Sequence, residues 1–271
     1  IVFGKTVPDI SLNAVANLGY AEGRFLLPVY AGDSLTSKSQ IIGLKENSNG
    51  KSGVLYVRTQ GSNQNGDVVL DYVRWVMVRK NNLDAAAPET VIPDLAKVIA
   101  PGDLAIPQGL TFANYPTTLA GEPHLWGDYE IGEVIDHVDG VTIEEAEHMM
   151  ATRLSQNTAK VHFDATFRDD GQRLIYGGHV ISMARALSFN GLANAQMIAG
   201  INAGAHANPC FAGTTIRAWS EVLDKAETAS PDIGALRLRL VATSAAGTAG
   251  QLRDEAGKYL PHVLLDLDYW T

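Results

Sequence analysis

The chain of 271 residues is 46% hydrophobic and 19% charged, a balance typical of a globular protein rather than of a disordered one. Its net charge of -9 argues against a nucleic-acid partner, which would need a basic face. No apolar run approaches the roughly 20 residues that span a bilayer, so we expect no membrane segment.

Cysteine and histidine usage limits the redox and metal chemistry. Cys210 is the only cysteine, which excludes an internal disulfide and a multi-cysteine metal site. The seven histidines lack the short spacings typical of metal ligands, so we predict no metal. The chain begins at Ile1 in apolar sequence without a basic signal-peptide region. We therefore expect a cytoplasmic protein whose upstream residues are absent from this sequence.

The first part of the chain has the pattern of β-structure. Apolar and polar residues alternate over 37–44, 53–59 and 68–78, with many β-branched and aromatic side chains, which predicts three strands. Asparagines and glycines at 47–50 and 63–67 separate these strands and predict hairpin turns.

The middle of the chain begins with a proline-rich stretch, 83–118, which we interpret as a connector. Thr142 to Glu145 has the pattern of a capping box, so a helix is predicted from there to about Arg153. This helix would lead into a loop that carries Asn157 and His162. Glutamates 144, 145 and 147, beside His148, are interpreted as the solvated face of this helix.

The last part of the chain predicts a helix followed by strands. Apolar residues at positions 180, 183, 184 and 187 give helical spacing over 178–189, and Asn190-Gly191 ends that helix. Strands are expected over 217–223, 234–243 and 263–270. A single apolar helix against an antiparallel sheet is an α+β arrangement.

The chain also contains an internal repeat. Three pairs of segments match in order: 28–35 with 209–216, 53–55 with 234–236, and 70–75 with 265–270. The separation is 181 positions for the first two pairs and 195 for the last, so the second copy carries 14 more residues, placed near 248–251. Duplication of one supersecondary unit explains this pattern.

The repeat predicts the domain organisation. The first unit is assigned to 1–82 and starts at its helix, a connector follows over 83–118, and the second unit covers 119–271. Pairing the two sheets side by side, with both helices on one side, would cover edge strands that are otherwise exposed.

The residues that carry chemistry lie in one cassette, Asn157 to Asp164, followed by Leu174 to His179. His162 can transfer protons at neutral pH. The glycine turn before the predicted helix lets backbone N–H groups approach an oxygen that gains negative charge. Together these features suggest proton transfer next to a carbonyl. Asp164 is an alternative proton donor, although a structural role is favoured for it.

The cassette and the glycine turn resemble the MaoC-like hot-dog hydratases, and most of all the mesaconyl-CoA hydratases, also called β-methylmalyl-CoA dehydratases. The resemblance implies a tandem, double hot-dog fold and a reversible hydration of mesaconyl-CoA to β-methylmalyl-CoA. It implies an acyl-CoA thioester as partner, no cofactor beyond the coenzyme A of the substrate, and a homo-oligomer. Alternatives are a general (R)-specific enoyl-CoA hydratase and a non-catalytic acyl-CoA binder. A thioesterase is disfavoured because 178–189 contains no carboxylate.

The resemblance also assigns roles by position. His162 corresponds to the catalytic histidine of the family, and Gly178 to the glycine whose N–H binds the thioester oxygen. Asn157 stands where the family usually has aspartate, and since its amide cannot transfer protons, it is expected to hold the water. Ala159 and Lys160 replace the usual asparagine and proline.

The predicted substrate-binding residues surround this cassette. The second carboxylate of mesaconyl-CoA should meet a cation, for which Lys160 is the first candidate and Arg173 the second. His179 faces either the thioester or the strand layer, and Tyr176, just before the glycines, completes the set. Tryptophans 75 and 270 are expected to be core residues.

Overall fold

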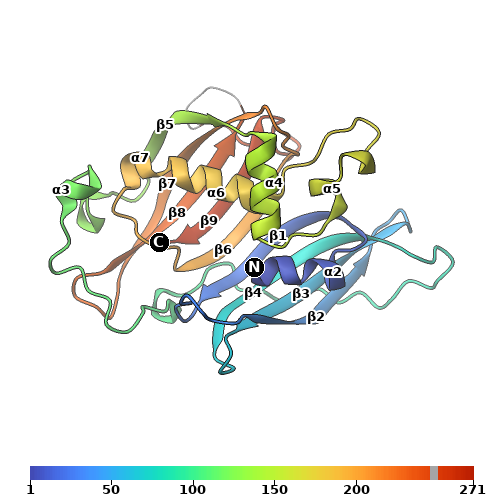
Figure 1. The fold of residues 1–271 in the computed structure, drawn as a ribbon, viewed down its shortest axis with the longest axis horizontal. Coiled ribbons are helices and arrows are strands. Elements are labelled where there is room, and N and C mark those ends of the chain that lie inside the picture. The colour runs from blue at the N-terminus through green and yellow to red at the C-terminus, as the bar shows by residue number, and fades with distance from the viewer. Residues whose placement is uncertain (245–249) are drawn as a thin grey trace.

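The computed structural model describes residues 1–244 and 250–271. Its strands form one antiparallel sheet in the order β2-β3-β4-β1-β6-β9-β8-β7-β5, with helices across one face (Figure 1). The strands are β1 (Ala14–Phe25), β2 (Thr36–Glu46), β3 (Ser52–Ser62), β4 (Val68–Arg79), β5 (Val134–Thr142), β6 (Gly200–His206), β7 (Thr215–Glu227), β8 (Gly234–Thr243) and β9 (Val263–Trp270). The α-helices are α1 (Val2–Lys5), α2 (Val7–Ile10), α3 (Thr117–Ala120), α4 (Glu145–Leu154), α5 (Lys160–Phe163), α6 (Gly177–Leu187) and α7 (Phe189–Leu192).

The order of the strands contains the repeat. On each side of the junction, β1 and β6, β4 and β9, β3 and β8, and β2 and β7 occupy equivalent places. The two halves meet where β1 pairs with β6, with Tyr20 opposite Gly204. The sheets are therefore joined side by side, and α1 and α2 lie on the same side as α4 and α6 (Figure 1). The arrangement confirms the expected α+β double hot-dog fold.

The observed strands agree in part with those predicted from the sequence. The predicted strands and both hairpin turns are present, although β2, β3 and β7 are longer than expected. Three observed strands, β1, β5 and β6, were not predicted. The segment between β8 and β9 is longer than the segment between β3 and β4, as the repeat requires. Of the insertion predicted near 248–251, residues 248 and 249 lie outside the described residues.

The capping box predicted at Thr142 is wrong. Thr142 is the last residue of β5, and its hydroxyl hydrogen-bonds to that of Thr215 across the ladder at 2.7 Å. Ile143 continues the pairing, since its N–H donates to the carbonyl of Thr214. Helix α4 starts only at Glu145 and has no side-chain cap. The strand therefore takes the groups that a cap would have used.

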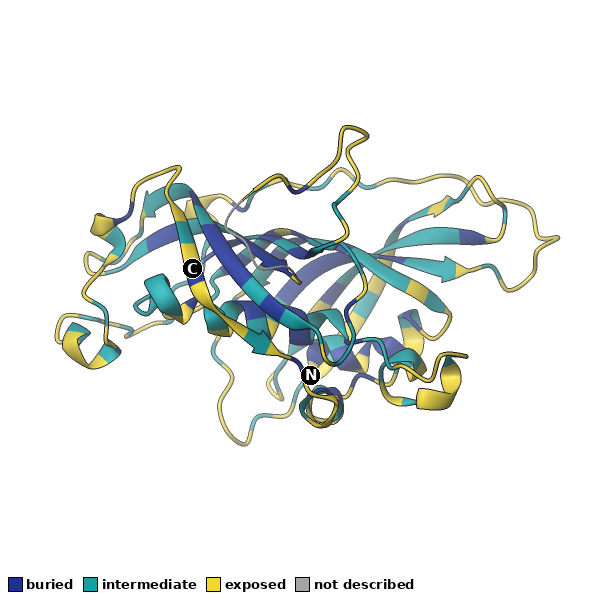
Figure 2. Cartoon of the chain, turned by 90° about the horizontal axis from the view of Figure 1, so that it is seen from above, coloured by how far each residue is buried: buried dark blue, intermediate teal, exposed yellow. Residues whose placement is uncertain are grey.

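Helix α6 covers the main core. Val180 and Ala184 are buried on its inner face and pack on residues of β7, β8 and β9. Figure 2 shows the buried residues concentrated along the central strands. The helix ends at Leu187, and Gly191 in α7, with a φ of 92°, turns the chain away as expected. Among the described helices, none is long and apolar enough to cross a membrane.

The two tryptophans serve the sheet. Trp270 is fully buried and its ring N–H donates to the carbonyl of Ile99 at 3.1 Å. This hydrogen bond holds the connector segment around Ile99 against the end of β9. Trp75 is half-buried, and a Cβ on Gly19 would lie 2.3 Å from its ring, so a glycine is needed there.

Candidate active site

His162 lies on the one-turn helix α5 and not in a loop as predicted. Its Nδ1 lies 2.7 Å from the carbonyl oxygen of Leu174, which can only accept, so Nδ1 carries the proton. The neutral ring therefore presents an unprotonated Nε2. Burial lowers the pKa of His162 below its ordinary value, although the bond to Leu174 opposes this. At neutral pH the side chain is a base with a free nitrogen.

The N-terminus of α6 supplies the hydrogen-bond donors. Gly177 and Gly178 occupy its first two helical positions, where backbone N–H groups have no partner within the helix. These two N–H groups bind no acceptor in the described part of the chain. The positive end of the helix dipole adds to them, so the site favours an oxygen that gains negative charge.

Close packing requires glycine at both positions. A Cβ on Gly177 would lie 2.1 Å from the ring of His206, and one on Gly178 would lie 2.5 Å from the ring of Tyr176. The absence of both side chains lets aromatic rings approach the helix N-terminus. The glycine turn thus serves the packing as well as the donors.

His148 lies at the centre of the ring cluster formed by His148, His162, Tyr176 and His179. Its centroid is 6.4 Å from that of His162 and 5.8 Å from those of Tyr176 and His179. Its Nε2 accepts the backbone N–H of Tyr176 at 3.1 Å. Burial, followed by the positive charges of nearby histidines and Arg173, lowers its pKa to about 4.

The interpretation of this part of α4 as a solvated face is therefore wrong for His148, which is 1% exposed. The helix must place one side against the α6 N-terminus, and His148 and Thr152 are its buried residues. The spacing of these two residues, one turn apart, is the signal that could have revealed the inward side.

The glutamates of α4 also make specific contacts. Glu147 lies 3.0 Å from Nε2 of His179, a ring that is 4% exposed, and Glu145 lies 2.7 Å from Arg173. His179 thus faces α4 and not the strand layer. Arg173 is already paired, whereas Lys160 is exposed at the start of α5, where its charge acts on Asp164. The structure brings His179, Tyr176 and Arg173 to the cluster and leaves Lys160 at its rim.

Asn157 holds the turn between α4 and α5. Its side-chain oxygen accepts the N–H of Ala159 at 3.1 Å, and its own N–H donates to the carbonyl of Thr152. The residue is buried. The amide NH₂ binds no acceptor among the described residues, so it is available as a donor to a water.

Asp164 serves the local structure. Its carboxylate accepts the N–H and the hydroxyl of Thr166, and these bonds hold its pKa below the ordinary value. The group is ionised at neutral pH and has no proton to give. In the described part of the chain, no group of three His, Cys, Asp or Glu side chains could hold a metal ion.

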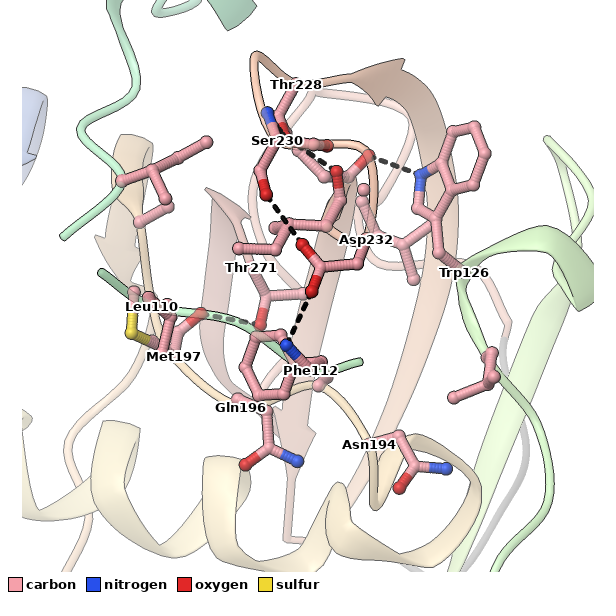
Figure 3. A pocket seen from close by; sticks show the side chains of 18 of the residues that line it. Leu110, Phe112, Trp126, Asn194, Gln196, Met197, Thr228, Ser230, Asp232 and Thr271 are labelled. Atoms are coloured by element: carbon pink, nitrogen blue, oxygen red, sulfur yellow. Dashed lines mark hydrogen bonds between the residues drawn. The ribbon is translucent and has the colours of Figure 1, made fainter. Parts of the chain in front are cut away.

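A cavity in the described part of the molecule lies away from these residues (Figure 3). It measures about 700 Å³ and is lined by residues 104–117 of the connector, by Trp126, and by Asn194 to Met197 beyond α7. Asp232 accepts the N–H of Phe112 across it. Neither the ring cluster nor the glycine turn contributes to its lining.

The sequence is similar to those of two enzymes with related names. It is 72% identical to a mesaconyl-CoA hydratase of Cereibacter sphaeroides over 271 residues, which are 100% of this chain and 79% of that protein. It is 59% identical to a β-methylmalyl-CoA dehydratase of Chloroflexus aurantiacus, over 99% of this chain and 78% of the relative. No family model matches the chain.

Solved structures agree with these relatives. A MaoC domain protein dehydratase from Chloroflexus aurantiacus superposes with a TM-score of 0.95 at 58% identity, over 99% of this chain and 78% of the other. A Mycobacterium tuberculosis protein with a double hot-dog fold superposes with a TM-score of 0.72 at 24% identity, over 99% and 78% of the two chains. The second likeness concerns the fold alone. The chain belongs to the family of the mesaconyl-CoA hydratases, also named β-methylmalyl-CoA dehydratases, and has their MaoC-like double hot-dog fold.

Proposed function

We propose that the protein is a hydro-lyase that reversibly adds water to mesaconyl-CoA to give β-methylmalyl-CoA. One observation carries this proposal. Nε2 of His162 and the N–H groups of Gly177 and Gly178 lie near one another, and none of them has a hydrogen-bond partner among the described residues. The identity of 72% to a mesaconyl-CoA hydratase supports the substrate. The reaction needs no cofactor, because the coenzyme A is part of the substrate.

The reaction begins with the thioester bound at the N-terminus of α6. The thioester oxygen accepts the N–H of Gly178, with that of Gly177 beside it. His162 Nε2 removes a proton from water as the water oxygen bonds to the β carbon, and the π electrons move to give an enolate. The donors stabilise the negative oxygen of this enolate.

The second step returns the proton. His162 now holds the proton that came from water, and it transfers this proton to the α carbon as the carbonyl re-forms. No further acid is required, which fits an ionised Asp164. Asn157, through its NH₂ group, orients the water before the first step. Dehydration runs through the same steps in reverse.

The position of the second carboxylate is a separate part of the proposal. Arg173 is held by Glu145, so its charge is already balanced. Lys160 is exposed two residues before His162 and has a flexible side chain. We therefore assign the carboxylate to Lys160, with Arg173 as the second candidate. A homo-oligomer also remains our expectation, since Met150 and Leu154 on α4 expose large apolar side chains.

One assay tests the function. Loss of the absorbance of the enoyl thioester is followed after purified protein is added to mesaconyl-CoA or to crotonyl-CoA. A clear preference for mesaconyl-CoA supports the proposal. A preference for crotonyl-CoA would favour a general (R)-specific enoyl-CoA hydratase, and binding of both without hydration would favour an acyl-CoA binder.

A further inference from the structure

Two residues from opposite halves of the chain meet beside the candidate site. Tyr20 on β1 and His206 on β6 are 186 positions apart, yet the tyrosine hydroxyl lies 3.0 Å from Nε2 of the histidine. Their rings make an edge-to-face contact with centroids 5.6 Å apart. The contact follows from the junction, because Tyr20 lies opposite Gly204, two residues before His206.

His206 also faces the reaction site. Its ring occupies the space that a side chain on Gly177 would fill, so it lies directly against the first residue of α6. It is close enough to His162 for the charge of one ring to affect the other. His206 thus lies against the N-terminus of α6 and within electrostatic range of the proposed base.

The protonation of the pair follows from burial. Desolvation, and then the nearby His162, lowers the pKa of His206 to about 4, so its ring is neutral at pH 7. Burial raises the pKa of Tyr20, so its hydroxyl keeps its proton. That proton needs an acceptor, and Nε2 of His206 is its partner. If Tyr20 donates, the ring proton of His206 lies on Nδ1.

This arrangement leaves one donor without a partner. Among the described residues, no acceptor binds Nδ1 of His206. Nδ1 of His206 is not among the buried side-chain atoms that lack a partner, so it has accessible surface and can donate to a water or to a ligand. A structural tyrosine–histidine pair would need neither a free Nδ1 nor a glycine against the ring.

We propose that His206 is a further catalytic residue, whose Nδ1–H donates to the thioester oxygen beside the N–H groups of α6. Tyr20 is the positioning residue that fixes the tautomer of His206 from the first half of the chain. A neutral imidazole can polarise a carbonyl because the donor strengthens its bond as the oxygen gains charge. This inference rests on the proposed function, since it names the atom that His206 meets.

The test uses His206→Leu, which removes the donor, His206→Gln, which keeps an N–H donor, and Tyr20→Phe, which frees the tautomer. Tyr269→Phe is the matched control. Its hydroxyl is also buried, in the second half of the sheet, but has no hydrogen-bond partner in the described part of the chain. Steady-state kcat and KM are measured with mesaconyl-CoA. The ultraviolet red shift of bound mesaconyl-CoA and crotonyl-CoA reports how strongly the thioester is polarised.

His206→Leu should lower kcat by about 10²–10³-fold, the effect of removing one oxyanion donor, with a smaller change in KM. Tyr20→Phe should lower kcat less, His206→Gln should recover part of the loss, and Tyr269→Phe should resemble the wild type. The red shift should shrink for both thioesters in His206→Leu and Tyr20→Phe.

Three results would overturn the inference: an unchanged red shift in His206→Leu, a loss of KM alone, or a loss confined to the dicarboxylic thioester. The last result would place His206 at the second carboxylate. A wild type that hydrates no enoyl-CoA would remove the proposed function. The red shift would then still decide whether His206 polarises a bound thioester.

Discussion

The two halves of the sheet share one strand layout but differ in what lies on it. In the first half, Arg74 on β4 is 1% exposed and is held by the hydroxyls of Ser11 and Thr6. In the second half, the equivalent position on β9 is Tyr269, which belongs to an apolar core under α6. All seven histidines lie after residue 123, so residues 1–82 contain none.

This difference shows that the same strand layout can carry a buried, hydrogen-bonded arginine in one half and an apolar core in the other. Hydrogen-bonded ladders and alternating side chains specify the strands of both halves, whatever chemistry the faces carry. The groups of the proposed reaction all come from the second half: the base His162 on α5, the N–H donors on α6 and His206 on β6. The first half contributes through the junction, where Tyr20 reaches His206. The five predictions that follow, each on one site, test how far stability and the reaction depend on the second half.

The largest expected effect comes from the proposed base. His162→Ala should lower kcat by about 10²–10⁴-fold, because no other histidine offers a free Nε2 beside the glycine turn in the described site. Circular dichroism and the melting temperature should change little, since α5 is short and half-exposed. Near-normal turnover in this variant would exclude His162 from the mechanism.

The second effect concerns acid stability. His148 has a folded pKa of about 4 against 6.5 when unfolded, so the unfolded state binds more protons between these pH values. The free energy of unfolding should therefore fall as the pH drops from 6.5 to 4, by about 3 kcal/mol for this group. Urea denaturation at several pH values measures the acid slope, which is the change in the free energy of unfolding with pH. The pKa of His206 is also lowered to about 4, so this residue contributes to the loss of stability at low pH in the same direction.

The matched variants for this slope are His148→Gln and His124→Gln. Glutamine at 148 can accept the N–H of Tyr176 but does not titrate, so the acid slope should become shallower. His124 is exposed and lies outside the ring cluster, so its replacement is the matched control for the loss of one histidine. An unaltered slope in His148→Gln would show that its burial does not control the acid stability.

The third effect concerns the glycine turn. Gly177→Ala places a methyl group against the ring of His206, so the free energy of unfolding should fall by about 1–3 kcal/mol, and kcat should fall with it. Gly102→Ala is the control, because its Cβ would meet open space and should change stability by less than about 0.5 kcal/mol. Equal stability of the two variants would mean that the ring of His206 moves freely.

The fourth effect separates the two roles of Asn157. Asn157→Ala should lower kcat by about tenfold or more and weaken the turn, since it removes a buried hydrogen bond. Asn157→Asp keeps the acceptor for Ala159, removes the NH₂ donor and introduces the carboxylate that is usual in the family. Thioester binding, measured by titration, should persist in both variants. Full activity of Asn157→Ala would show that the side chain of Asn157 does not orient the water.

The smallest effect concerns the choice of substrate. Lys160→Met should reduce the preference in kcat/KM for mesaconyl-CoA over crotonyl-CoA by about two- to fivefold, because an exposed ion pair contributes at most about 1 kcal/mol. Arg173→Met is the comparison, since it also frees Glu145. Equal losses on both thioesters in Lys160→Met would assign the lysine to the coenzyme A moiety or to the fold.

Local signals in the sequence determined much of this protein. Alternating apolar residues and Asn-Gly turns predict β3, β4, β8 and β9, and helical spacing predicts α6, since these patterns depend on neighbours in the chain. The repeat predicts a joined double sheet because an exposed edge is unfavourable. The cassette identified His162 and the glycine turn as the candidate site.

Only the tertiary structure decided the rest. Strands β1 and β6 are rich in alanine and glycine, so their extended form is set by pairing on both sides and not by their own propensity. His148 and His206 join the site only after α4 packs on α6 and the two halves pair, because these contacts link residues far apart in the chain. The same packing brings Arg173 into an ion pair with Glu145 and places His179 against the carboxylate of Glu147. Burial, which no local pattern fixes, then lowers the pKa of the histidines that surround the proposed base.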